Sequence, residues 1–322
     1  MIRPFARIAL VGTIAVAGWL AVACLSWGGS VAPAGVEKPD LTVAAVPSLD
    51  SAGLYIAQQR GLFAAEGLHV TIVPAISSTT VIASQLAGKY DATLGAYPGY
   101  ILADALHHAN LRILAAGSNM APLFLQVMVP SGSPIRNLAG LRGKRIGVNA
   151  PNNIATLLVT SLLSSSGVAP NEVTFVAIPF PKMAAALKAH QVDAAWLPEP
   201  FITQAEESSG ATTLADVDQG ATQGLPVTGY VVTQSWLDKY PRTAAAVRRA
   251  LLKAQAIANT DLGAVQNGMA AYAGVPRATA ELAALPAYPE RTDVRLLQRI
   301  SDLMEQFGMT TQDFDVSQMI PR

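Results

Sequence analysis

The chain has little cysteine and little charge. One cysteine occurs among 322 residues, and Asp, Glu, Lys and Arg together make up 14% of the sequence. A single cysteine excludes an internal disulfide, so the fold must be stabilised by burial of apolar side chains. The 22 basic residues balance the 22 acidic ones and form no basic run, which argues against a nucleic-acid-binding surface. After Cys24 no apolar run is long enough to span a bilayer.

Common catalytic motifs are also missing. The sequence contains no HExxH, no paired-cysteine metal spacing, no Gly-x-Ser-x-Gly elbow, no Walker loop and no dinucleotide fingerprint. Of the four histidines, His107, His108 and His190 fall at expected helix C-termini, where the helix dipole favours them. The sequence therefore predicts a protein that binds rather than reacts, with no metal and no cofactor.

The N-terminus has the pattern of an export signal. Arg3 and Arg7 precede an uncharged apolar stretch that runs from residue 8 to residue 23 and ends in small residues before Cys24. A helix of that length reaches about 24 Å, short of the roughly 30 Å hydrocarbon core, which disfavours the alternative of an uncleaved membrane anchor. Residues 20–24 resemble a bacterial lipobox, although ordinary signal peptidase could also cut after Ala23. We expect a signal peptide over residues 1–23, lipidation of Cys24 and a flexible tether over residues 24–40.

Short apolar strands alternate with helices in the next part of the chain. Strands are expected at residues 41–46, 69–74, 92–96, 112–116, 144–149, 173–178 and 194–197, and helices at 51–63, 77–87, 154–163 and 182–190. This alternation is typical of the α/β class, with mostly parallel sheets flanked by helices. After Tyr240 the pattern becomes helical, most clearly at 244–258 and 294–307.

An internal echo divides the chain further. Residues 76–92 match residues 178–194 at a constant offset of 102, and Tyr97 and Glu199 follow at equivalent positions. Shared α/β patterning is the alternative explanation. A true repeat predicts two similar lobes, with lobe I over 41–125 plus 230–322 and lobe II over 126–229. The extended stretches 125–129 and 227–232 would cross between them.

Polar and aromatic side chains gather after the predicted strands, where open parallel sheets bind their ligands. Hydroxyls and free N–H groups at helix N-termini hold anions or polar ligands, and amides and aromatic rings add partners and walls. Each of these residues can instead serve only in capping or core packing. The candidate ligand-binding residues are Asp50, Ser77, Ser78, Thr79, Tyr97, Tyr100, Asn149, Asn152, Asn153, Trp196 and Glu199.

Residues 55–70 (YIAQQRGLFAAEGLHV) carry the most specific motif. They resemble the first helix and second strand of ABC-importer substrate-binding proteins of the nitrate/sulfonate/taurine/thiamine-pyrimidine-precursor family. Residues 86–91, 138–148 and 192–200 fall where that family has similar motifs. The resemblance implies a two-lobed type II periplasmic-binding-protein fold that captures a small polar solute. It also implies delivery of the ligand to a permease with a cytoplasmic ATPase. Together with the leader, this leads us to expect a monomeric lipoprotein that is exported and anchored at the cell membrane, facing the periplasm or the cell exterior.

Several functions remain open at this point. Sulfonates or nitrate would suit the hydroxyl cluster, whereas Asp50 and Glu199 would suit an amine or an aminopyrimidine. A tethered ligand sensor is another alternative. The family also contains enzymes that make the thiamine pyrimidine, but those carry a cysteine-rich motif, and here the single cysteine lies in the leader.

Overall fold

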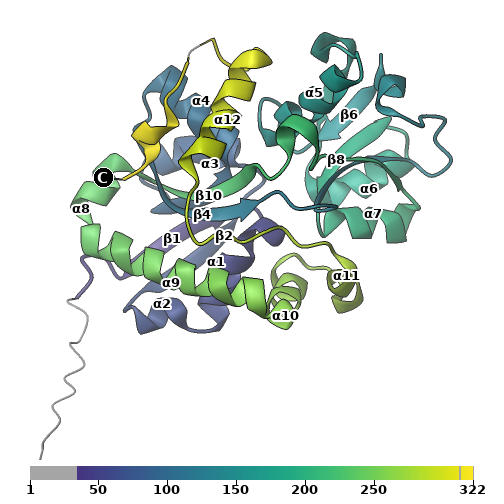
Figure 1. The fold of residues 1–322 in the computed structure, drawn as a ribbon. Coiled ribbons are helices and arrows are strands. Elements are labelled where there is room, and N and C mark those ends of the chain that lie inside the picture. The colour runs from purple at the N-terminus through teal and green to yellow at the C-terminus, as the bar shows by residue number, and fades with distance from the viewer. Residues whose placement is uncertain (1–34, 312, 322) are drawn as a thin grey trace, which may run out of the picture. The chain divides into compact units, whose positions relative to one another are not determined.

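The computed structural model describes residues 35–311 and 313–321, with every side chain in them except that of Ser78, and contains two five-stranded sheets (Figure 1). The strands of the first sheet lie in the order β2 (His69–Pro74), β1 (Asp40–Ala45), β3 (Ala92–Ala96), β10 (Pro226–Thr233) and β4 (Leu111–Asn119). β1 pairs in parallel with β2 and β3, whereas β10 runs antiparallel to β3 and β4.

The second sheet repeats this topology. Its order is β7 (Thr174–Ala177), β6 (Arg145–Val148), β8 (Ala194–Pro198), β5 (Leu125–Val129) and β9 (Thr212–Asp216). β6 pairs in parallel with β7 and β8, and β5 runs antiparallel to β8 and β9. Two mixed sheets flanked by helices confirm the predicted α/β class.

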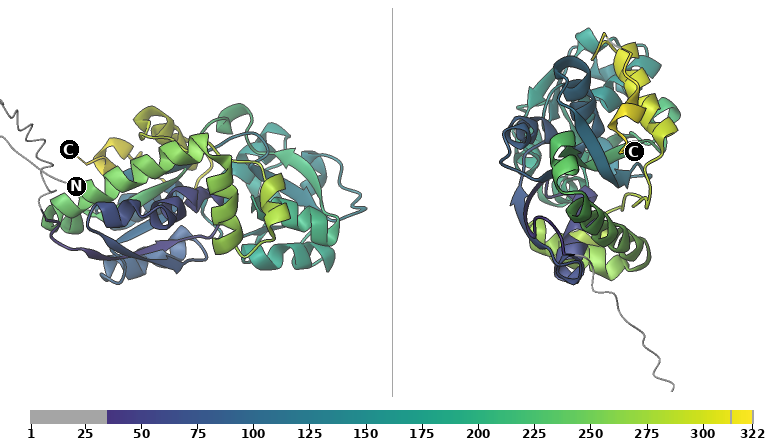
Figure 2. Two further views of the ribbon diagram at one scale, coloured as in Figure 1. Left: turned by 90° about the horizontal axis from the view of Figure 1, so that it is seen from below. Right: turned by 90° about the vertical axis from the view of Figure 1, so that its left-hand side faces the viewer.

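Helices cover both sheets. The α-helices are α1 (Ala52–Gln59), α2 (Leu62–Ala65), α3 (Ser78–Leu86), α4 (Tyr97–His107), α5 (Ile154–Ser165), α6 (Phe180–Lys188), α7 (Phe201–Ser209), α8 (Gln234–Lys239), α9 (Pro241–Thr260), α10 (Leu262–Tyr272), α11 (Arg277–Leu282) and α12 (Val294–Gln306). The short 3-10 helices are η1 (Leu49–Ser51), η2 (Leu138–Leu141), η3 (Pro170–Glu172), η4 (Gly220–Thr222) and η5 (Val316–Met319). The long helix α9 packs along α1 beside the first sheet (Figure 2). Within the described part of the chain, no helix is both long and apolar enough to cross a membrane.

The internal echo corresponds to a structural repeat. α6 begins and ends 102 residues after α3, and β8 lies 102 residues after β3. The aspartates before β3 and β8 play the same part: Asp91 accepts the N–H of Thr42 and Asp193 accepts the N–H of Arg145, each at 2.9 Å. Both carboxylates thereby fasten the start of a neighbouring strand, so the two β-α-β units are equivalent in structure.

Two expectations need correction. The helix expected over residues 51–63 is broken between α1 and α2, because Gly61 adopts a left-handed conformation with φ 66°. The stretches expected to cross between lobes lie within single sheets, 125–129 as β5 and 227–232 inside β10. The links between the sheets are instead residues 120–124 and 217–225, since the strands at either side of them already belong to different sheets.

Candidate functional site

A cleft lies where the carboxyl ends of the parallel strands of both sheets meet. Its lining comes from the turns after β1, β2, β6 and β7, from the ends of β3 and β8, from the start of α5 and from the start of β10. The residues are Val46, Ser48, Asp50, Ser51, Ser77, Leu94, Gly95, Ala96, Asn149, Asn153, Ile154, Phe180, Trp196, Pro198, Val227 and Thr228. The cavity measures about 40 Å³, so a molecule larger than a few waters enters only if the walls move apart.

Backbone and amide hydrogen bonds join the two halves at this cleft. The side-chain N–H of Asn149, after β6, donates to the carbonyl of Ile76 at 3.2 Å. The N–H of Leu49, after β1, donates to the carbonyl of Glu199 at 3.3 Å. Each bond links a turn of the first sheet to a turn of the second, and two such bonds are a small barrier to separation in water.

The lining of the cleft contains one carboxyl group, that of Asp50. Its carboxylate accepts hydrogen bonds from the hydroxyls of Ser48 at 2.9 Å and Ser118 at 2.5 Å, and Ser118 in turn contacts the hydroxyl of Thr228 at 2.9 Å. Burial raises the pKa of Asp50 above its usual value, while the two hydroxyls oppose that rise. The lining contains no lysine, arginine or histidine to neutralise the carboxylate.

Two polar atoms of the lining have no partner within the described part of the protein. They are the side-chain oxygen of Asn149 and the indole nitrogen of Trp196. Asn149 is 9% exposed and Trp196 3% exposed. The amide of Asn149 is oriented by its bond to Ile76, which requires the nitrogen on that side and leaves the oxygen unpaired. A buried polar atom without a partner costs about 1–3 kcal/mol, so a ligand that pairs with both atoms is stabilised by that amount at each.

The hydroxyl cluster mainly caps α3. The hydroxyl of Ser77 accepts the N–H of Thr80 at 3.4 Å and contacts the hydroxyl of Thr79 at 3.0 Å. Ser77 lines the cleft, Thr79 is exposed outside it, and Ser78 is the first residue of α3. Asn153 caps α5 in the same manner, with its side-chain oxygen accepting the N–H of Ile154 at 2.8 Å, and it also lines the cleft.

Besides Thr79, four candidates lie away from the cleft lining: Tyr97, Tyr100, Asn152 and Glu199. Tyr97 is fully buried, with its ring against Gly229 of β10, and Tyr100 donates to the hydroxyl of Thr93 at 2.8 Å inside the first half. The expected aromatic walls are therefore core packing. Asn152 is exposed, with φ 54°, and its N–H binds the hydroxyl of Thr156.

Glu199 is the fourth of these, and its carboxylate is engaged by protein groups. It accepts the N–H and the hydroxyl of Thr203 at 3.1 and 2.9 Å, and the N–H of Ala284 at 3.4 Å. Burial raises the pKa of Glu199 to about 7 in spite of these bonds. Its side chain thus ties α7 to the segment after α11, while its backbone carbonyl lies at the junction of the two halves.

Sequence reasoning missed several lining residues. Phe180 begins α6 at the position equivalent to Ser78 in α3, so the offset of 102 would have identified it. Phe180 packs against Trp196 with ring centroids 5.8 Å apart. Thr228 lines the cleft, and Ser118 lies outside the lining but bonds to Asp50 and contacts Thr228. The two residues belong to strands far apart in the sequence, and nothing in either strand distinguishes them from core positions.

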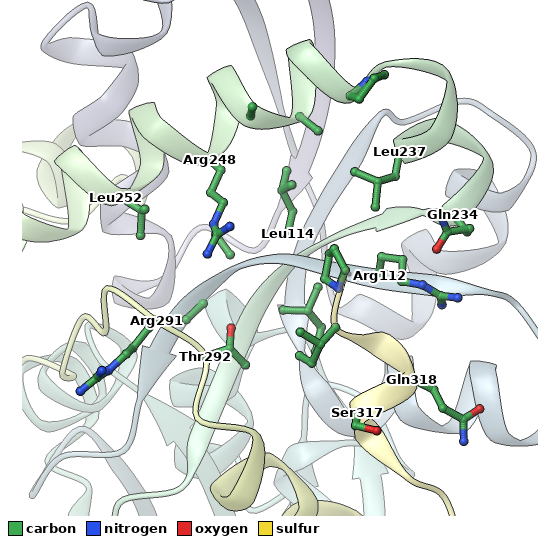
Figure 3. Close-up of a pocket in the computed structure, with 18 of the residues that line it drawn as sticks. Arg112, Leu114, Gln234, Leu237, Arg248, Leu252, Arg291, Thr292, Ser317 and Gln318 are labelled. Carbon is green, nitrogen blue, oxygen red and sulfur yellow. The ribbon is translucent and has the colours of Figure 1, made fainter.

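A larger hollow lies along the free edge of β4, away from the strand ends. Figure 3 shows it between β4, α9 and the C-terminal segment, with Arg112, Arg248 and Arg291 around it. Its volume is about 1270 Å³, and its lining also contains Asp238, Glu290 and Asp315. None of the predicted site residues lines this groove. Its charges are mixed, and it lacks the buried unpaired polar atoms of the cleft.

The fold is that of the periplasmic binding proteins. The alkanesulfonate-binding protein SsuA from Xanthomonas axonopodis pv. citri, solved with bound MOPS, matches with a TM-score of 0.78 at 20% identity, over 89% of this chain and 100% of that one. Its neighbours are mainly binding proteins. A desulfurization enzyme, DSZB, shares the fold with a TM-score of 0.67 at 18% identity, over 88% of this chain and 96% of that one.

The chain belongs to the NMT1/THI5-like family, whose model matches residues 48–261. Similar sequences include the bicarbonate transport ATP-binding protein CmpC of Synechocystis sp., 26% identical over 70% of this chain and 36% of that protein. The nitrate/nitrite binding protein NrtA of Nostoc sp. is 24% identical over 76% of this chain and 64% of that protein. The chain thus spans between about a third and two thirds of the length of these curated relatives.

Among residues 35–311 and 313–321, no group of His, Cys, Asp or Glu side chains is arranged to hold a metal ion.

Proposed function

We propose that this chain is the extracytoplasmic substrate-binding component of an ABC importer. It captures a small polar solute of the sulfonate, nitrate or taurine type and delivers it to a permease with a cytoplasmic ATPase. Family membership supports this function, as do relatives named for nitrate binding and bicarbonate transport and a fold shared with an alkanesulfonate-binding protein.

The observation that carries the proposal is the pair of unpaired polar atoms in the cleft. Asn149 and Trp196 come from the turn after β6 and from β8, and they line the same cleft as Asp50 and Ser77 of the first half. Such an arrangement is typical of a binding site that encloses a small polar molecule between two halves.

We propose two lobes, one around each sheet, joined through residues 120–124 and 217–225. The cleft is then the space between the lobes, and the Asn149–Ile76 and Leu49–Glu199 hydrogen bonds belong to its closed form. Ligand release requires these bonds to break, which costs little because water replaces them.

The residues in the cleft support binding without turnover. Its lining offers one carboxylate, hydroxyls and amides, with no histidine or lysine to act as a general base beside a nucleophile. We therefore propose that the ligand leaves chemically unchanged.

We propose that the chain is exported, lipidated at Cys24 and held at the membrane as a monomer. Cys24 lies outside the described residues, so this rests on the leader sequence. Cys24→Ser should move the protein from the membrane fraction to the soluble extracytoplasmic fraction. Retention of the variant in the membrane would instead indicate an uncleaved helix.

Equilibrium dialysis of the full chain against labelled taurine, alkanesulfonates, nitrate and bicarbonate tests the proposal. We expect about one ligand per chain, recovered intact by mass spectrometry. Asn149→Ala should weaken binding roughly 5- to 150-fold, because it removes one buried partner. Asn152→Ala is the matched control, since Asn152 is exposed and outside the cleft. Equal losses in both variants, or conversion of the ligand, would contradict the proposed site.

A further inference from the structure

Several helices begin at the cleft, and their starts favour a negative charge inside it. The lining contains the N-cap residues of α1, α3, α4 and α5 and the first residue of α6. Each helix start carries a partial positive charge, so an anion placed between them is stabilised although the lining has no lysine, arginine or histidine.

Asp50 competes with an anionic ligand for this environment. It is the one residue of the lining whose side chain ionises as an acid. The cavity measures about 40 Å³, so an anion enclosed by these walls lies beside the carboxyl group. Two negative charges at close range repel each other strongly in a region of low dielectric. The enclosed cleft therefore favours one of the two charges at a time.

A protonated Asp50 suits an anion in the cleft. The carboxyl group accepts the hydroxyls of Ser48 and Ser118, and when protonated it keeps acceptor capacity and gains one O–H donor. Nitrate and simple alkanesulfonates carry acceptor oxygens only, so the neutral acid donates to them where the ionised acid repels them. The buried, unpaired indole N–H of Trp196 is a second donor of the lining.

The other titratable groups around Asp50 differ from it in charge or in position. Tyr230, Tyr272 and Tyr288 face it from β10, α10 and the segment after α11, and burial raises the pKa of each, so all three stay neutral. Burial also raises the pKa of Asp50. The carboxyl group of Glu199 is bonded to α7 and to the segment after α11, outside the lining.

We propose that an anion binding in the cleft is accompanied by uptake of a proton at Asp50, which then donates a hydrogen bond to the ligand. This inference rests on the proposed binding function and adds control of that site by pH. The complex holds the proton more tightly than the empty protein does. Affinity for an anion of constant charge is therefore highest in acid and falls by up to about 10-fold per pH unit above the pKa of Asp50 in the empty protein.

Calorimetric titration of the full chain with nitrate and with ethanesulfonate tests the inference. Both anions keep one charge between about pH 5 and pH 9, so any change with pH belongs to the protein. Titrations in two buffers of different ionisation enthalpy count the protons taken up. We expect uptake that approaches one proton per ligand, and an affinity that falls at least about 10-fold from about pH 5 to about pH 8.

Asp50→Asn resembles the protonated acid, because the amide is neutral, has nearly the same shape and keeps an N–H donor. The variant should bind the same anions without proton uptake and with an affinity that does not change with pH. At about pH 8 it should bind at least about 10-fold more tightly than the wild type. A merely structural role for Asp50 would instead weaken binding at every pH.

Two control variants separate Asp50 from other buried acids. Glu199→Gln removes a carboxyl group whose pKa burial raises to about 7, and Asp104→Asn makes the same chemical change at a buried carboxyl group outside the cleft. Both should keep the proton uptake of the wild type. The wild-type titrations and Glu199→Gln decide the question even if Asp50→Asn fails to fold.

Anion binding by the wild type without proton uptake would overturn the inference and leave the proposed binding function standing. So would proton uptake that persists in Asp50→Asn or disappears in Glu199→Gln. Failure of both anions to bind at any pH would count against the proposed function, and the inference would fall with it.

Discussion

Glu199 makes the stability of this protein depend on pH. The side chain is 3% exposed, and burial, with a smaller contribution from Glu206, raises its pKa from 4.5 to about 7. Hydrogen bonds from Thr203 and Ala284 oppose the rise. The folded protein therefore holds this proton more tightly than the unfolded chain does.

The direction and size of this pH effect follow from the linkage between protonation of Glu199 and folding. The stabilisation from protonated Glu199 is fully present below about pH 4.5 and is lost as the pH rises to about 7. Each pKa unit corresponds to about 1.4 kcal/mol, so the contribution is on the order of 3 kcal/mol. Glu199→Gln removes this titration. The free energy of unfolding of the wild type, measured relative to that of the variant, should then fall by about 3 kcal/mol between pH 4 and pH 8.

Urea unfolding followed by circular dichroism at a series of pH values measures this difference. Asp193→Asn serves as a control of opposite sign, because hydrogen bonds and charge from Arg145 lower the pKa of Asp193. Stability from Asp193 is present at neutral pH and is lost as the pH falls, so wild type and Asp193→Asn should converge in acid. Parallel pH curves for wild type and Glu199→Gln would refute the reasoning.

Three further substitutions have clear expectations. Gly229→Ala would place a methyl group 2.6 Å from the ring of fully buried Tyr97 and should lower the free energy of unfolding in urea by about 1–3 kcal/mol. Gly263→Ala is the control: Gly263 lies in α10, and the nearest atom to an added methyl group is the carboxylate of the capping residue Asp261 at 3.4 Å, so the change should be neutral or stabilising by up to about 1 kcal/mol. Trp196→Phe keeps an aromatic ring but removes the unpaired N–H. Trp196→Phe should weaken binding of the ligand identified by dialysis roughly 5- to 150-fold while shifting the ligand-free Tm by only a few degrees. Undiminished affinity would mean that the indole does not contact the ligand.

The fold could be predicted well where the determining pattern is local. Each β-α-β unit occupies a short stretch of sequence, so strand periodicity and the offset of 102 identified α3, α6, β3 and β8 correctly. The sheet assignment of 227–232 could not be read in this way. An apolar extended stretch looks the same whether it crosses between sheets or lies in the middle of one, and only pairing with β3 and β4 decides.

The cleft could be predicted only in part. Asp50, Ser77, Asn149, Asn153 and Trp196 meet because they lie at the carboxyl ends of strands, which the sequence locates. Tyr97 and Tyr100 follow a strand as well, yet they turn into the core, because packing decides which face of α4 is buried. Ser118 and Thr228, 110 residues apart, meet only through the pairing of β4 with β10.

The position of β10 fixes the order in which the two sheets can be completed during synthesis. The second sheet is continuous in sequence, from Leu125 to Asp216, and has all its strands before β10 is made. Within the described strands β4 pairs only with β10. β4 therefore has no strand to pair with until Pro226–Thr233 has been synthesised. The half that begins first therefore finishes last. A nascent chain that ends before Pro226 has every strand of one sheet, while in the other β4 remains separated from β3.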